Sequence, residues 1–343
     1  MTNPLVSVLI PAFNAEHTIG DTLRSAFAQT WPNIEIVVVN DGSRDRTADI
    51  VRAAGDRRVR LIEQVNQGAA AARNTAYSAC HGDLIQWLDA DDLLAPDKIA
   101  RQVEMWRQVG DRRLLLSGAW AGFMHRPDRA AFRPTPLWTD LTATEWLLRK
   151  MRDNLYMQTA TWLVPRELTE AAGAWDTHLL ADDDGEYFCR VLMASHGVKF
   201  VPQARVYYRS SGVASLSYIG QSSRKLEAHL LSIRKHVRYL RSLEDSARIR
   251  EACGRYLQRE LLHFYSERPD LVAELEGIAA EIGVILQPPV LPWKYQWVRR
   301  LFGWRAARQA QLLLPMLKWS LLRASDKAML RIQGHPPYAR LGS

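Results

Sequence analysis

The stretch LVSVLIPAFNAEHTIGDTLRSAFAQTWPNIEIVVVND, residues 5–41, reads as a strand, a helix and a second strand. Residues 5–10 are rich in β-branched side chains, and Pro11 is expected to end that strand. Residues 16–29 carry apolar side chains at helical spacing. Residues 34–39 are almost entirely apolar, which is typical of a strand covered on both faces. This segment therefore predicts a β-α-β unit.

The same alternation continues through the next seventy residues. Helices are expected over 45–55, 68–80 and 96–108, and further strands over 59–64 and 83–88. Such alternation predicts an α/β fold in which ligands bind at the carboxyl ends of the strands. Three polar clusters follow the first, second and fourth strands, namely PAFNAE, NDGSRD and DADD. These clusters are therefore expected to meet at one edge of the sheet.

The remainder of the chain is less regular. We expect a strand at 114–120, a loop at 126–138, a helix at 142–153, a two-strand segment at 196–209 and helices from 221 to 285. Prolines 288, 289 and 292 mark a further boundary. The predicted organisation is an α/β domain at 1–220, a helical region at 221–289 and a basic amphipathic tail at 290–343.

Charge is concentrated in the tail. Residues 290–343 contain ten Lys and Arg and one Asp, a net charge of +9, whereas the whole chain has +8. The rest of the protein is thus nearly neutral, which argues against nucleic-acid binding by the whole molecule. The cysteines Cys80, Cys189 and Cys253 show no metal-binding spacing and suit a reducing compartment. Without a signal peptide or membrane span at the N-terminus, a cytoplasmic location is expected.

Four tryptophans accompany this charge: Trp293, Trp297, Trp304 and Trp319. Basic residues beside Trp and Leu are typical of helices that lie on anionic membranes, so the tail is expected to dock peripherally on the inner face of the membrane. The alternative is a helical arm that packs on the catalytic domain or on a second subunit. Homo-oligomerisation is left open.

The cluster after the fourth predicted strand, Asp89-Ala90-Asp91-Asp92, raises a question of charge. Crowded carboxylates raise one another's pKa unless a cation neutralises them. Asp89 and Asp91 can hold a divalent metal such as Mn²⁺ or Mg²⁺, which also takes phosphate oxygens. The alternative is that Asp91 or Asp92 caps the following helix. Neither a P-loop nor a G-x-G-x-x-G fingerprint is present, so those phosphate-binding folds are excluded.

Residues 6–47, NQGAAAARNTA and GDLIQWLDADD together resemble the inverting family-2 glycosyltransferases, which have the GT-A fold. The resemblance is specific over 5–110 and fainter over 150–215. It implies a nucleotide-diphosphate-sugar donor. It also implies roles for seven residues: Pro11, Ala12 and Phe13 would line the base and ribose pocket, Asp41 would contact the base or ribose, Arg73 would lie near the base, Asp89 would face the ribose or metal, and Asp91 would ligate the metal.

Several of these residues have simpler alternatives. The simpler role for Pro11 is to stop a strand, and Asp41-Gly42 is also a plain turn signal. Arg73 could be a charge on a helix surface. It follows four alanines in a helix that looks buried, however, which favours a ligand-binding role.

A second acidic cluster lies in LLADDDGEYFCRVLMASHG, residues 179–197, and resembles the family's E-D-x-D-L-x-x-R segment. Counted back from Arg190, Asp183 and Asp184 fall at the E-D positions. The resemblance makes Asp184 the general base. Glu186 is the next acid, and Asp182 offers a competing register. The alternative is an acidic helix start. Arg209 stands where family members often have a metal-binding His, and it could contact the diphosphate instead.

The sequence as a whole predicts an inverting, metal-dependent glycosyltransferase of the hexosyltransferase type. Its expected acceptor is a glycan or lipid-linked hydroxyl in cell-surface polysaccharide or glycolipid synthesis. The alternative is a catalytically silent nucleotide- or sugar-binding module of the same fold.

Overall fold

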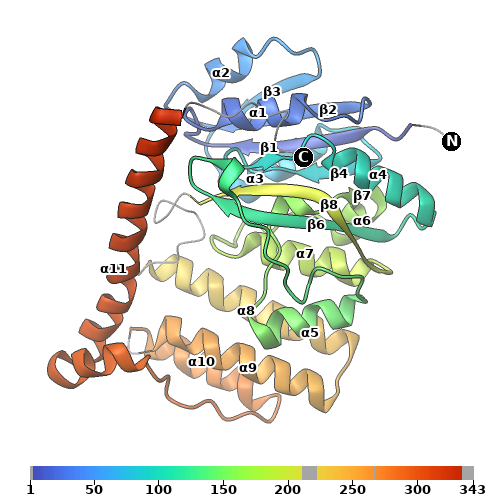
Figure 1. Cartoon of the computed structure of the whole chain (residues 1–343). Helices are drawn as coiled ribbons and strands as arrows, with labels where there is room; N and C mark the ends of the chain where they lie inside the picture. The colour runs from blue at the N-terminus through green and yellow to red at the C-terminus, as the bar shows by residue number, and fades with distance from the viewer. Residues whose placement is uncertain (1–2, 211–221, 266, 334–343) are drawn as a thin grey trace.

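The central sheet has five strands in the order β3-β2-β1-β4-β7 (Figure 1). The structure is a computed structural model that describes residues 3–210, 222–265 and 267–333. The strands of this sheet are β1 (Val6–Ala12), β2 (Ile34–Asp41), β3 (Val59–Gln64), β4 (Leu84–Trp87) and β7 (Val164–Pro165). The first four are parallel, and β7 pairs with β4 in the antiparallel direction. The expected α/β fold is confirmed.

Three helices connect the four parallel strands as predicted, and a fourth helix follows β5. They are α1 (Ile19–Phe27), α2 (Thr47–Ala53), α3 (Ala69–Ser78) and α4 (Lys98–Val109). The fourth helix was expected to start at Pro96 and begins two residues later, at Lys98. Leu9, Val37 and Val39 face one apolar cluster, while Val8 and Val38 face another that includes residues of α1 and α4. The central strands are thus covered on both faces, which explains their almost continuous apolar sequence.

Pro11 does not end the first strand, contrary to the prediction. Residues Pro11 and Ala12 remain paired with Val39 and Asn40 of β2. The neighbour on the other side, β4, is paired with β1 only as far as Leu9. Beyond that point β1 has a strand on one side only, so a residue that lacks an N–H is tolerated.

A second, three-stranded sheet has the order β5-β8-β6. Its strands are β5 (Leu93–Leu94), β6 (Leu114–Phe123) and β8 (Gly197–Arg209). The prediction of two strands within 196–209 is wrong, because both halves of β8 pair with β6 in the same parallel direction. The pairing is interrupted where Val201 and Arg205 face consecutive residues of β6. The bulge includes Pro202, which shifts the register without reversing the chain.

Two 3₁₀ turns and three helices complete the region before residue 210. They are the 3₁₀ turns η1 (Pro127–Arg129) and η2 (Thr159–Thr161) and the helices α5 (Ala143–Asp153), α6 (Arg166–Ala172) and α7 (Asp183–Ala194). The helix at 142–153 and the acidic helix start near 183 were both predicted. The short strands β5 and β7 and helix α6 were not.

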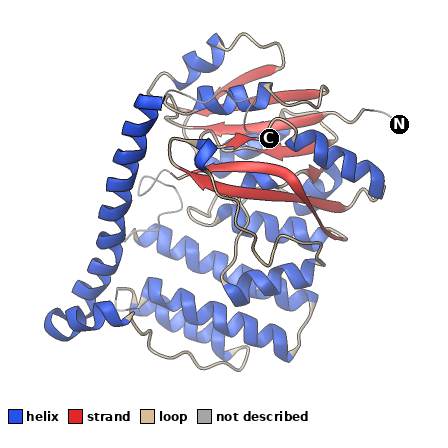
Figure 2. Cartoon of the chain, in the orientation of Figure 1, coloured by secondary structure: helices blue, strands red, loops and turns tan. Residues whose placement is uncertain are grey.

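Three helices follow the two sheets and stack below them in Figure 2. They are α8 (Ser223–Leu243), α9 (Ala247–Phe264) and α10 (Pro269–Ala280). Helix α8 packs on α7, and α9 packs on α5, α8 and α10. A single apolar cluster runs from Leu9 of the sheet to Ile282 after α10. The helical region and the sheet therefore share a core. The expected boundary at residue 220 lies outside the described residues.

The tail forms α11 (Trp293–Gln333), which rises along one side of the molecule in Figure 1. Its backbone is non-helical at Gly303, where φ is 80°, so a turn separates a short first segment from a longer second one. The Asp326 carboxylate near its far end accepts hydrogen bonds from Arg126 Nε at 2.6 Å and from the His125 main-chain N–H at 2.9 Å. Within the described residues, no helix has the length and apolarity needed to cross a membrane.

Candidate active site

Two carboxylate clusters far apart in the chain meet at Arg73, on α3. Its Nη2 donates a hydrogen bond to Asp89 Oδ1 at 2.8 Å, and its Nη1 donates to Asp183 Oδ2 at 2.7 Å. Asp89 follows strand β4, and Asp183 begins helix α7. The structure therefore brings three residues singled out from sequence into direct contact.

Arg73 is buried, so the alternative of a surface charge is wrong. Its side chain is only 7% exposed, and its Cζ lies 4.4 Å from the centroid of the Trp175 ring. Burial opposes protonation, but the charges of Asp183 and Asp89 raise the pKa of Arg73 above its ordinary value. The stacked ring and the paired carboxylates together fix the plane of the guanidinium.

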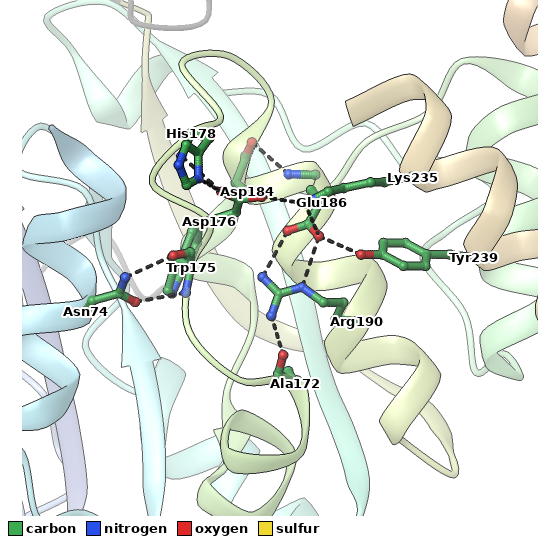
Figure 3. Close-up of polar contacts among 11 residues, drawn as sticks. Asn74, Ala172, Trp175, Asp176, His178, Asp184, Glu186, Arg190, Lys235 and Tyr239 are labelled. Atoms are coloured by element: carbon green, nitrogen blue, oxygen red, sulfur yellow. Dashed lines mark hydrogen bonds and ion pairs between the residues drawn. The ribbon is translucent and has the colours of Figure 1, made fainter. Parts of the chain in front are cut away.

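Trp175 was not predicted, because the residues around it carry no recognisable motif. Its main chain is held by Asn74, the neighbour of Arg73 on α3 (Figure 3). Asn74 Nδ2 donates to the Trp175 carbonyl at 2.9 Å, and the Trp175 N–H donates to Asn74 Oδ1 at 2.8 Å. Successive residues of one helix thus position the indole ring and the cation beneath it.

The turn after β4 places its three carboxylates in different surroundings. The Asp89 side chain is 31% exposed, whereas Asp92 is fully buried. Asp92 accepts hydrogen bonds from the Arg209 main-chain N–H at 2.8 Å and from the Gln158 side chain. Burial, and then the charge of Asp89, raises the pKa of Asp91 to about 6. Asp92 thus anchors the turn, and burial and the neighbouring carboxylates raise its pKa as well.

These carboxylates do not cap the next helix, so that alternative is wrong. Helix α4 begins at Lys98 with Asp97 at its N-cap, and no side-chain capping bond is present there. Strand β5 separates the acidic turn from the helix.

The structure directs Arg209 toward protein groups. Its Nε donates to the Asp91 carbonyl at 2.8 Å, and its Nη2 donates to Asp21 Oδ2 of α1 at 3.0 Å. The guanidinium also lies over Phe123, with 4.7 Å between Cζ and the ring centroid. Arg209 therefore ties the acidic turn to α1 and to β6. Asp21 looks like an ordinary acid in the first turn of a helix, so sequence did not single it out.

Asp41 lies at the end of β2 and is buried. Its carboxylate accepts hydrogen bonds from the main-chain N–H groups of Gln67 and Gly68 at 2.9 and 2.8 Å, and from the Gln64 side chain at 2.7 Å. It thereby holds the loop that leads into α3. Gly42 has a φ of 71°, and a Cβ there would lie 2.8 Å from the Asn66 nitrogen, so this turn requires glycine.

Pro11 and Ala12 end β1 beside Asp41, and Phe13 follows them with half of its surface exposed. The next residue, Asn14, has a φ of 48°. Its N–H donates to Ser43 Oγ at 2.9 Å, and its Oδ1 accepts from the Arg44 N–H at 2.9 Å. The loops after β1 and β2 are therefore fastened together at the sheet edge where the nucleotide was predicted.

Asp184 is the neighbour of Asp183 in the first turn of α7. Its Oδ2 accepts a hydrogen bond of 3.3 Å from Thr159 Oγ1, and its Oδ1 accepts one of 2.9 Å from the Gly185 N–H. Burial, and then the charges of Asp183 and Asp182, raises the pKa of Asp184 to about 6. A carboxylate that titrates near neutrality is suited to accept a proton.

Asp182 is turned to the other side, toward the C-terminal helices. Its Oδ2 accepts a hydrogen bond from Ser232 Oγ at 2.6 Å and lies 3.6 Å from His236 Nδ1, both on α8. It sits at the N-cap of α7 with a φ of 57°, and a Cβ on Gly185 would lie 2.0 Å from its Oδ1. Glycine at 185 thus gives Asp182 room to fold back over the turn. The contacts of Asp182 are those of a structural anchor.

Glu186, the next acid, is neutralised by protein groups. Its Oε1 accepts hydrogen bonds from Arg190 Nε at 3.0 Å and from the Tyr239 hydroxyl at 2.7 Å, and Lys235 Nζ lies 3.4 Å away (Figure 3). Only 1% of its side chain is exposed. Burial opposes ionisation of Glu186, but hydrogen bonds from Arg190 and Tyr239 lower its pKa. Glu186 and Asp182 therefore brace α7 from α8, and neither contacts the Arg73 bridge.

Asp89 and Asp91 offer oxygen donors of the kind that a hard divalent cation takes. Both present carboxylate oxygens, the donors that Mg²⁺ and Mn²⁺ prefer. The raised pKa of Asp91 reflects burial and repulsion from Asp89, which a bound cation would relieve. The donor set thus fits such an ion.

Arg73→Lys is expected to lower the free energy of unfolding by about 1–3 kcal/mol, because an ammonium cannot replace the planar fork between two carboxylates and one of them loses its partner. Urea denaturation at pH 7 measures the change. Arg52→Lys, in a half-exposed ion pair with Asp49, is the matched control and should shift stability by less than about 0.5 kcal/mol. Equal stability of the two variants would show that the Arg73 bridge does not stabilise the fold.

Comparison with known proteins gives a family for the N-terminal part. Residues 7–134 match the family model Glycosyl transferase family 2. The chain is 30% identical over 217 residues to the glycosyltransferase EpsJ of Bacillus subtilis, a match that covers 61% of this chain and 62% of EpsJ. Matches to other curated glycosyltransferases cover 17% to 44% of their length. The chain thus spans less than two thirds of the length of these relatives.

Solved structures agree on the fold. TarS of S. aureus in complex with UDP superposes with a TM-score of 0.59 at 17% identity, over 87% of this chain and 79% of TarS. The mannosyltransferase PcManGT of Pyrobaculum calidifontis, in complex with GDP-Man and Mn²⁺, gives a TM-score of 0.50 at 20% identity, over 91% of this chain and 88% of PcManGT. The GT-A architecture expected from sequence is confirmed.

Proposed function

Since residues 7–134 match glycosyl transferase family 2, we propose that this protein transfers a sugar from a nucleotide-diphosphate-sugar donor to an acceptor hydroxyl with inversion at the anomeric carbon. The Arg73 bridge carries the proposal. It joins the turn after β4, on the donor side of the sheet, to the first turn of α7, which holds a carboxylate of raised pKa.

The proposed reaction is a single displacement. Asp184 accepts the proton of the acceptor hydroxyl, and the oxygen attacks the anomeric carbon on the face opposite the diphosphate. The new carbon–oxygen bond forms as the bond to the diphosphate breaks, and the nucleoside diphosphate leaves with the electron pair. An α-linked donor then gives a β-linked product. Thr159 and the Gly185 N–H hold the Asp184 carboxylate in place.

A divalent cation held by Asp89 and Asp91 would neutralise negative charge on the diphosphate. Arg73 keeps Asp89 oriented toward this position while it pairs with Asp183. Asp41, Pro11, Ala12 and Phe13 remain the proposed contacts of the nucleoside, at the ends of β1 and β2. Arg209 is proposed to position the acidic turn through its hydrogen bond to the Asp91 carbonyl. Any contact between Arg209 and the diphosphate would be made while this hydrogen bond is kept.

Release of nucleoside diphosphate from a panel of UDP- and GDP-sugars tests the proposal, with Mn²⁺ or Mg²⁺ present and with EDTA as the control. At least one donor is expected to be turned over, and EDTA to stop the reaction. A silent binding module would instead show a thermal shift with a nucleotide sugar and no release from any donor, with or without glycan and lipid-linked acceptors. That outcome would overturn the enzymatic proposal.

We further propose that α11 docks on an anionic membrane surface and brings the enzyme to a lipid-linked or membrane-proximal acceptor. Trp293, Trp297 and Leu301 are spaced four residues apart on one helical face and are 84%, 59% and 70% exposed. Phe302 adds a further exposed aromatic ring. Basic residues flank these side chains, an arrangement that interfacial helices use.

Other residues in and just before α11 pack on the protein. Leu291, Tyr295 and Ala307 are buried in a small apolar cluster with Leu262 of α9. Trp304, one of the four tryptophans expected to favour membrane docking, packs on Tyr265 with 4.8 Å between ring centroids. Packing on this chain and the proposed docking on a membrane therefore use different side chains of the tail, so the two alternatives are compatible.

Flotation with anionic vesicles at low salt tests the docking face. The full-length protein is expected to float, and the double variant Leu301→Glu, Phe302→Glu to lose most of that binding, because two charges replace exposed apolar side chains. Val65→Glu, at an 83% exposed position on the catalytic domain, is the matched control. Flotation of the double variant as efficient as that of the wild type would show that this face is not used.

A further inference from the structure

A cluster of two histidines and a glutamate lies between α8 and α9, in the helical region beyond the acidic site. His229 Nε2 is 2.8 Å from Glu260 Oε2, and His263 Nε2 is 3.7 Å from the same oxygen. One ligand atom from each residue lies within 4.8 Å of the others. We propose that His229, Glu260 and His263 bind one divalent transition metal of the zinc type.

The fold explains why these side chains converge. Glu260 and His263 are three residues apart on α9 and so project from the same face of that helix. His229 projects from α8, which packs against α9. The two imidazole rings meet edge to face, with 5.3 Å between their centroids. Side chains of α8 and α9 therefore bring their metal-binding atoms together in one place.

The chemistry of these donors differs from that of the acidic site. Two imidazole nitrogens and a carboxylate are ligands that zinc accepts, with a fourth position left for water. Zinc–nitrogen and zinc–oxygen bonds of about 2.0–2.1 Å put neighbouring tetrahedral ligands roughly 3.3 Å apart. The separations of 2.8 and 3.7 Å bracket that value. Asp89 and Asp91 offer only oxygen and favour a harder ion.

The cluster lies between apolar packing on one side and solvent on the other. His229 is 7% exposed and stacks on Phe264, with 5.9 Å between ring centroids. Its Nε2 contacts Glu260, and its Nδ1 has no hydrogen-bond partner among the described residues although it is buried. His263 is partly exposed, which gives a metal access from solvent. Arg308 of α11 brings a positive charge near His263, and Glu260 supplies the opposing negative charge.

A metal here would act on the active site through α8. Ser232 and His236, three and seven residues after His229, lie on the same face of α8 and contact Asp182 at the start of α7. A cross-link from α8 to α9 would limit movement of the helix that braces the turn carrying Asp183 and Asp184. The role assigned to the metal is structural.

Metal binding by the untagged full-length protein tests this inference. Protein stripped with EDTA is titrated with Co²⁺ in a buffer that contains excess Mg²⁺. The Mg²⁺ occupies sites made only of oxygen ligands. The wild type is expected to bind one equivalent and to show the visible bands of a low-symmetry nitrogen- and oxygen-ligated Co²⁺ ion. Zn²⁺ is expected to displace the Co²⁺ and to raise the thermal unfolding midpoint.

Two variants and two controls locate the site. His263→Ala and Glu260→Gln are each expected to weaken Co²⁺ binding by roughly tenfold or more while circular dichroism stays unchanged. His178→Ala, at an exposed histidine, and Asp91→Asn are expected to bind Co²⁺ as the wild type does. The inference is overturned if the wild type binds no Co²⁺ under these conditions, or if both cluster variants bind it with wild-type affinity and spectrum.

Discussion

Asp184→Asn is expected to lower sugar transfer by about 10²–10⁴-fold, the usual contribution of a general base, while nucleotide binding survives. Asparagine keeps the size of the side chain and cannot take up the acceptor proton. Nucleoside diphosphate release at saturating donor and acceptor measures turnover, and thermal shift with the nucleotide measures binding.

The adjacent carboxylate provides the control. Asp183 is paired with Arg73, so Asp183→Asn should disturb the bridge and retain more activity than Asp184→Asn. Complete loss in Asp183→Asn together with a nearly active Asp184→Asn would assign the base to Asp183.

Because the pKa of Asp184 is raised, the rate of sugar transfer is expected to depend on pH. Turnover is expected to fall as pH drops below about 6, where the carboxylate becomes protonated. Stability should move in the opposite direction. A pKa raised in the folded state means that folding disfavours the ionised form, so this group destabilises the protein above pH 6 and the penalty fades as pH falls. Asp184→Asn is therefore expected to keep or raise the unfolding midpoint at pH 7.

Asp91→Asn is expected to reduce donor turnover on the order of 10³-fold. Loss of one carboxylate removes a charge that would hold the cation, and a cation at a diphosphate contributes several kcal/mol to the transition state. Initial rates across a Mn²⁺ titration measure the effect, which should persist at saturating metal if the remaining ligands misplace the ion. The fold is expected to survive, because relief of the repulsion behind the raised pKa of Asp91 offsets any lost contact.

Asp97→Asn is the matched control, since this carboxylate lies on the same segment and pairs with Arg101 at the surface. It should leave turnover within about twofold of the wild type. Wild-type rates in Asp91→Asn, or full activity in EDTA, would refute the metal site.

The fold of the first half was largely predictable because each element has its own local signal. The apolar runs of β1, β2 and β4 and the helical periodicity of α1 and α3 are complete within a few residues of sequence. Elements without such a signal were missed. Strands β5 and β7 are two residues long and exist only because β8 and β4 offer them a partner. The bulge in β8 likewise depends on β6.

The candidate site divides in the same way. Asp89, Asp91, Asp183 and Asp184 stand out as dense acidic clusters, and Arg73 as a cation among alanines. Pairing between Arg73 and the two clusters arises from tertiary structure and has no sequence signal. Thr159 and Trp175 reach the site in the same way. The separate tasks of Asp182 and Asp184 follow from which element each contacts, α8 for Asp182 and η2 for Asp184.

The bracing of α7 by α8 bears on how such proteins can be recombined. The segment that matches the family ends at residue 134, yet the proposed base lies beyond it, in a turn anchored by Ser232, Lys235, His236 and Tyr239. A chimera that exchanged only the C-terminal helices would have to preserve these four side chains to keep the catalytic turn in register. Helix α7 and the helices that brace it thus form one structural unit, and a functional chimera would have to exchange them together.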